Sequence, residues 1–126
     1  MTLRTAAIMF GIVFLVIGFL GFVPGAVTDD MLFGVFHVNL AHNLVHLISG
    51  SVALIVALGS VPACRNFFRI FGLVYGVVAI LGFVQPDSNI LGLIANNMAD
   101  TWLHVGIAAT SLILGFAVPQ RVAQRA

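Results

Sequence analysis

Two pairs of ionisable residues recur in this sequence at the same spacing. His42 and His46 are four residues apart, and Asp100 and His104 repeat that spacing 58 positions later. Side chains four apart on a helix share one face, about 5–6 Å between Cβ atoms. Three imidazoles and a carboxylate suit a tetrahedral divalent transition metal, with zinc favoured and iron or copper as less specific alternatives. The spacing therefore predicts a metal site formed by these four residues.

Other interpretations of the same residues stay open. Asn97 and Asp100 have the spacing of a helix capping pair, and Asn39 would cap the helix that carries the histidine pair. The histidines would then belong to a structural hydrogen-bond network. Alternatively, His46 and His104 would be the axial ligands of a haem in an electron-transfer protein. Ionisable groups at membrane depth are costly and usually functional, which favours a ligand over a purely structural network.

The remaining polar residues add little chemistry. His37 is matched by Ala95 at the same spacing, so we interpret it as a loop residue and a possible auxiliary ligand. Tyr75 and Trp102 are interpreted as packing residues or interfacial anchors. The chain contains no glutamate or lysine to serve as a separate general base, which argues against an enzyme.

Composition places these residues in a membrane protein. Hydrophobic residues make up 61% of the 126 residues and charged residues only 7%, against about 45–50% and about 25% in soluble domains. The lipid bilayer is thus the expected surrounding. A net charge of +1 offers no surface for a nucleic acid, and the single Cys64 excludes an intrachain disulfide.

Four apolar segments are long enough to cross a bilayer as helices. They cover residues 6–23, 40–59, 67–84 and 98–118, and the four prolines fall at or just beyond their ends. A cleaved signal peptide is the alternative for the first segment, but about 18 apolar residues exceed the usual 7–15-residue signal core. We therefore expect one all-α domain, a four-transmembrane-helix bundle over residues 1–126.

The bundle is predicted to be a tandem duplication of a two-helix unit. Gly-Ile-Val-Phe at 11–14 reappears as Gly-Leu-Val-Tyr at 72–75, and Leu-Gly-Phe-Val at 20–23 recurs at 81–84. Gly34, Asn39, Ala41 and His46 match Gly92, Asn97, Ala99 and His104 at a spacing of 58. The repeats cover about residues 5–60 and 66–118. Because each contains two spans, they face the same way, which predicts a pseudo-twofold axis along the membrane normal.

The arginines predict how the chain lies in the membrane. Arg4, Arg65, Arg69, Arg121 and Arg125 all fall on one side of the four spans, and the opposite connections carry only aspartates among charged residues. The positive-inside rule makes the arginine side cytoplasmic, with both termini inside. Apolar residues 31–38 and 90–96 are expected to form short lids over the opposite, histidine-bearing end.

The sequence resembles a bacterial family of small four-helix membrane proteins known only as a domain of unknown function. The resemblance covers most of the chain and is most specific in the His-Asn-x-x-His stretch at 42–46 and the Asp-x-x-Leu-His stretch at 100–104. The family is loosely similar to the DoxX-like membrane proteins. The resemblance implies a multi-pass protein of the bacterial cytoplasmic membrane and leaves its activity open.

Three functions are consistent with these observations. The first is metal binding in a structural or ligand-binding role, and the second is haem-dependent electron transfer. The third is a metal-free accessory subunit of a larger membrane complex, in which the polar cluster only specifies helix pairing. A homo-oligomer is compatible with each of them.

Overall fold

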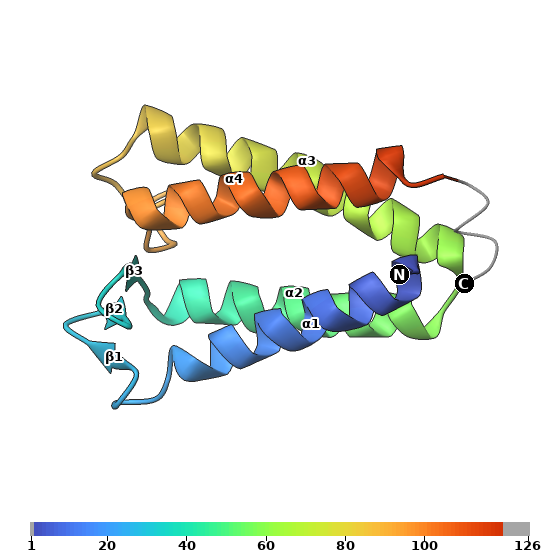
Figure 1. Cartoon of the computed structure of the whole chain (residues 1–126). Helices are drawn as coiled ribbons and strands as arrows, with labels where there is room; N and C mark the ends of the chain where they lie inside the picture. The colour runs from blue at the N-terminus through green and yellow to red at the C-terminus, as the bar shows by residue number, and fades with distance from the viewer. Residues whose placement is uncertain (1, 120–126) are drawn as a thin grey trace.

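The computed structural model describes residues 2–119 as two helical hairpins lying side by side (Figure 1). The first consists of α1 (Leu3–Leu20) and α2 (Leu40–Leu58), and the second of α3 (Val61–Val84) and α4 (Met98–Leu112), which continues as a π-helix, η1 (Ile113–Ala117). All four helices are long and apolar enough to span a membrane. The predicted all-α bundle of four membrane-spanning helices is therefore confirmed.

Helix α3 begins six residues earlier than predicted, which corrects the boundary at residue 67. The hydroxyl of Ser60 accepts from the backbone N–H of Ala63 and caps the helix, and Pro62 lies in the first turn. A proline is tolerated there because first-turn N–H groups have no intrahelical acceptor. The connection between the hairpins is consequently very short, and Arg65 and Arg69 lie within α3.

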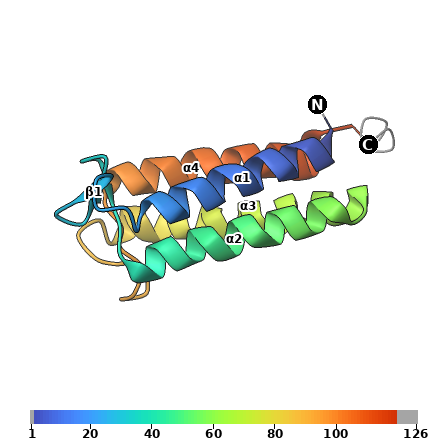
Figure 2. The same ribbon diagram turned by 90° about the horizontal axis from the view of Figure 1, so that it is seen from below.

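The connection between α1 and α2 contains a small sheet that the sequence did not predict. Strands β1 (Val27–Thr28), β2 (Met31–Leu32) and β3 (Phe36–His37) pair antiparallel in the order β1-β2-β3. The connection between α3 and α4 has a single bridge between Ile90 and Ile94. Figure 2 shows both connections at the same end of the bundle, called here the loop end.

Both connections turn through the same backbone conformation. Phe33 and Gly34 have φ values of 54° and 70°, and Leu91 and Gly92, 58 positions later, have 54° and 71°. Two successive positive φ values are the signature of a tight primed turn, which explains a glycine at the second position of each. The repeat seen in the sequence thus extends to the loop backbone.

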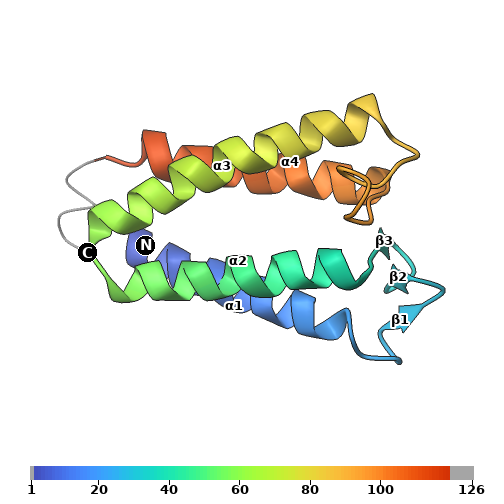
Figure 3. The same cartoon turned by 180° about the vertical axis from the view of Figure 1, so that it is seen from behind.

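Packing is closer within each hairpin than between them. Helix α1 runs along α2 and α3 along α4, whereas the hairpins contact one another less extensively (Figure 3). A Cβ on Gly11 would lie 2.9 Å from the carbonyl oxygen of Gly50, so the two backbones touch where α1 crosses α2. Between the hairpins, the ring of Phe71 meets those of Phe10 and Phe14 at centroid distances of 5.2 and 5.4 Å.

The three arginines within the described residues gather at the end opposite the loops. Arg4 donates through Nη2 to the carbonyl of Gly59 at 2.7 Å. Arg65 and Arg69 both donate to the carbonyl of Gly115 in η1, at 3.1 and 2.9 Å. These guanidinium groups satisfy carbonyls near helix C-termini. Arg121 and Arg125, which are predicted from the sequence to lie at this end, fall outside the described residues.

We expect Gly11→Ala to lower the free energy of unfolding by about 1–3 kcal/mol, because the new methyl group overlaps the Gly50 backbone. Gly106→Ala is the matched control, since a Cβ there meets nothing within 4 Å. Unfolding by SDS in mixed micelles, followed by far-UV circular dichroism, measures both. Equal stability of the two variants would contradict the close α1–α2 crossing.

Candidate functional site

Asn39 and Asn97 begin the two helices that carry the histidines. The side chain of Asn39 accepts from the backbone N–H of His42 at 2.9 Å, and that of Asn97 accepts from Asp100 at 2.9 Å. The carboxylate of Asp100 in turn accepts from the backbone N–H of Asn97 at 3.0 Å, which completes a capping box. Both asparagines therefore fix where the histidine-bearing turns start.

The same asparagines tie the repeats together reciprocally. Asn39 donates through Nδ2 to the carbonyl of Leu93, and Asn97 donates through Nδ2 to the carbonyl of Val35, both at 2.9 Å. The two bonds are equivalent under the repeat, because Asn97 lies 58 positions after Asn39 and Val35 lies 58 positions before Leu93. Such exchange of equivalent contacts is what a twofold relation between two similar units produces.

His42 and Asp100 occupy equivalent positions and make equivalent contacts. The Nδ1 atom of His42 lies 2.9 Å from the carbonyl oxygen of Ala95, and the Oδ2 atom of Asp100 accepts from the backbone N–H of His37 at 3.1 Å. Because Ala95 and His37 are themselves equivalent positions, each side chain binds the loop of the other repeat. A carbonyl can only accept, so Nδ1 of His42 carries a proton and its Nε2 carries a lone pair.

The aromatic contacts of the histidines follow the repeat as well. His46 stacks between His42 and Phe14, with centroid distances of 4.9 Å on both sides. Its equivalent, His104, meets the edge of Tyr75, the equivalent of Phe14, at 5.4 Å. Packing against rings holds the imidazole planes in place without using their nitrogen atoms.

These nitrogen atoms have no partners. The Nδ1 atoms of His46 and His104 are buried and make no hydrogen bond with the part of the chain that is described. A buried polar group without a partner costs about 1–3 kcal/mol. Two imidazoles that each bury a nitrogen atom without a partner are therefore a costly arrangement for a purely structural cluster.

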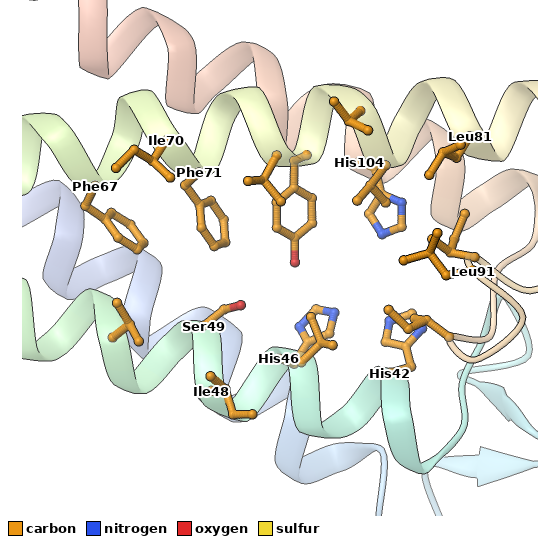
Figure 4. Close-up of a pocket in the computed structure, with 18 residues that line it drawn as sticks. His42, His46, Ile48, Ser49, Phe67, Ile70, Phe71, Leu81, Leu91 and His104 are labelled. Carbon is orange, nitrogen blue, oxygen red and sulfur yellow. The ribbon is translucent and has the colours of Figure 1, made fainter.

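All three imidazoles line one cavity between α2 and α3, of about 670 Å³. Figure 4 shows His42 and His46 on one wall and His104 across from them. Ile90, Leu91 and Ile94 of the second connection close the loop end of the cavity, as the predicted lid over residues 90–96 would. Most of its other lining residues are aliphatic or aromatic.

The predicted ligand Asp100 is engaged elsewhere. Its side chain is only 1% exposed and accepts from two backbone N–H groups, those of His37 and Asn97. Among the described residues, no three His, Cys, Asp or Glu side chains are grouped in a way that could hold a metal ion. The cavity thus gathers the three histidines, while Asp100 and His37 connect the repeats beside it.

Two polar residues of the cavity were not predicted to belong to it. Tyr75, interpreted from the sequence as a packing residue, lines the cavity together with Ser49. The sequence did contain a signal for both. At the repeat spacings Tyr75 corresponds to Phe14 and Ser49 to Ile107, so each is polar where its counterpart is apolar.

Fold and site together define a multi-pass four-helix membrane protein with a histidine-lined cavity between its two hairpins. A family model described as "Domain of unknown function (DUF4383)" matches residues 4–117. The chain therefore belongs to this family, which agrees with the resemblance to an uncharacterised family seen in the sequence. The match gives no support to the looser similarity to the DoxX-like proteins. No curated protein and no solved structure matches the chain.

We expect Asp100→Ala to lower the free energy of unfolding by about 2 kcal/mol, because it removes the capping box and leaves two N–H groups without an acceptor. Asp100→Asn keeps an acceptor oxygen and should retain most of that stability. His37→Ala is the control, since His37 contributes only its backbone N–H to this contact. SDS unfolding measures all three variants. A His37→Ala loss as large as that of Asp100→Ala would contradict the assignment.

Proposed function

We propose that this protein is a membrane-embedded binding protein that holds a small ligand through the imidazoles of His42, His46 and His104. The observation that carries the proposal is the convergence of three imidazoles on one cavity, two of which bury an Nδ1 atom without a hydrogen-bond partner. A ligand that pairs with them would remove the cost of burying them unpaired. A cavity of mostly apolar lining with a few convergent polar groups is typical of small-molecule sites.

The position of the cavity supports access from the bilayer. It lies between the two hairpins, where packing is least extensive, and its lining includes Ile48, Ile70 and Leu91, which are 63%, 64% and 76% exposed. In a membrane these side chains would face lipid. We propose binding rather than catalysis because Asp100, the carboxylate beside the imidazoles, is occupied by backbone N–H groups.

We further propose that the protein resides in the bacterial cytoplasmic membrane with both termini inside. The three arginines within residues 2–119 lie together at the end opposite the histidines, and the positive-inside rule places that end in the cytoplasm. The histidine cavity would then open toward the outer leaflet.

A divalent transition metal, with zinc favoured, is the second candidate ligand. The observation in its favour is His42, whose Nδ1–H is held by the Ala95 carbonyl. Metal-ligating histidines use this arrangement to present the Nε2 lone pair. His42, His46 and His104 would hold the ion, and because they are not grouped closely enough for this in the described residues, their side chains would have to move together when it binds. Asp100 would join them only by giving up its backbone partners.

The proposal is tested with the protein purified in detergent and a His46→Phe, His104→Phe double variant. Phenylalanine preserves ring packing and removes the nitrogen atoms. Organic extraction with mass spectrometry, elemental analysis and an absorption spectrum are recorded on both. We expect about one equivalent of a small molecule or metal in the wild type and a loss of at least tenfold in the variant. Equal content, or none in either protein even after loading with ligand, would contradict it.

The same measurements separate the alternatives. Zinc bound by wild type and by Asp100→Asn, but not by the double variant, would indicate a three-imidazole metal site. Zinc lost in Asp100→Asn as well would make Asp100 a ligand. A Soret band would indicate haem held by His46 and His104. Co-purification of another subunit, without ligand, would favour the accessory role.

The His46→Phe, His104→Phe double variant should bind ligand more weakly than the wild type but be more stable when no ligand is bound. We expect the ligand-free double variant to be more stable than the ligand-free wild type by about 1–2 kcal/mol, because it no longer buries the two unpaired Nδ1 atoms. Unfolding in SDS on delipidated samples measures the difference. A less stable double variant would mean that the histidines have structural partners.

A further inference from the structure

The histidine cavity continues along the bundle as a groove. A second cavity of about 450 Å³ shares Val52, Phe67, Ile70 and Phe71 with it and reaches Asn66 near the start of α3. From His42 to Val56 the two cavities follow 15 residues of α2, a rise of about 21 Å at 1.5 Å per residue. This α2/α3 groove is longer than one leaflet of the hydrocarbon core, about 15 Å. The histidines, Ser49 and Tyr75 line the half nearer the loop end, and Asn66 lies at the other end.

A third cavity, of about 290 Å³, lies between α1 and α4 and uses the same positions of the repeat. Its α1 residues are Ala6, Met9, Phe10, Val13, Phe14 and Ile17. Shifted by 61 positions they become residues of the α2/α3 groove, namely Phe67, Ile70, Phe71, Val74, Tyr75 and Val78. Duplication has thus produced two related cavities in one chain, which provides an internal comparison.

The two cavities differ in their polar groups. The α2/α3 groove has Tyr75 and Ser49 where the α1/α4 cavity has Phe14 and Ile107. The Tyr75 and Ser49 side chains come close to each other within the groove, next to the histidines. The α1/α4 cavity has only His46 and Thr110 as polar lining residues. Hydrogen-bonding groups are therefore concentrated in one of two otherwise equivalent cavities.

The groove also selects against charge. No arginine, lysine, aspartate or glutamate within residues 2–119 lines it, and an unpaired charge at membrane depth is costly. The Nε2 atom of His42 is a hydrogen-bond acceptor, because the proton of the neutral ring is on Nδ1 and is donated to the Ala95 carbonyl. The hydroxyls of Tyr75 and Ser49 can donate as well as accept. A hydroxyl on the ligand would match both kinds of partner.

We infer that the α2/α3 groove binds an uncharged amphiphile with a single hydrocarbon chain. Its hydroxyl-bearing head lies among the three imidazoles, Ser49 and Tyr75, and its chain runs along α2 and α3 toward Asn66. This inference rests on the proposed function and names the class of ligand.

The experiment measures binding of 1-monooleoylglycerol to the detergent-purified chain by native mass spectrometry. Wild type is compared with a Ser49→Ile, Tyr75→Phe variant, which introduces the residues found at the equivalent positions. Thr110→Val is the matched control in the α1/α4 cavity. We expect the double variant to bind about 30-fold more weakly, as for two lost hydrogen bonds, and the control to be unchanged. If the double variant does not fold, Tyr75→Phe alone replaces it, with an expected loss of about fivefold in affinity for 1-monooleoylglycerol.

Two further probes test the head and the chain. Oleate presents a charged head and 1-octadecene has none, so both should bind at least tenfold more weakly than 1-monooleoylglycerol. Equal binding of 1-octadecene, or unaltered binding by the folded variants, would overturn the inference. A histidine-dependent ligand that is charged or lacks a chain would overturn it while the proposed function stands. Absence of any histidine-dependent ligand would overturn both.

Discussion

The reciprocal hydrogen bonds at the loop end are the constraint on which the rest of the structure depends. Asn39 and Asn97 each start a helix and each bind the loop of the other repeat. These side chains both begin the helices and pair carbonyls of the connection in the other repeat. The two hairpins are thereby fixed to each other at one end.

With this end fixed, the hairpins need not pack closely along their whole length. Aromatic rings and the short connection between α2 and α3 hold them together, and cavities remain between α2 and α3 and between α1 and α4. The histidines lie one or two turns below the reciprocal bonds, so their positions follow from the helix starts. A rigid frame beside an open cavity is the arrangement that a preorganised binding site requires.

Asp100 and His42 occupy equivalent positions of the sequence repeat and have the same structural role despite their different chemistry. Each binds the loop of the other repeat, one as an acceptor and one through a protonated ring nitrogen. The two cavities differ in polar groups, because Tyr75 and Ser49 correspond to the apolar Phe14 and Ile107, whereas Thr110 corresponds to Val52. The structural contacts stayed reciprocal because altering one partner leaves a buried group unpaired.

The sequence by itself determined the membrane-spanning helices, the duplication and the capping asparagines, because hydropathy, internal spacing and cap residues act over short stretches of chain. From their aligned positions it also predicted a four-residue site of His42, His46, Asp100 and His104, of which the three histidines line one cavity. Only the tertiary structure decided that Asp100 also accepts from the N–H group of His37 in the other repeat, and that Tyr75 and Ser49 line the cavity. Such outcomes depend on which loop and helix face meet across the hairpins, and spacing within one helix carries no information about that.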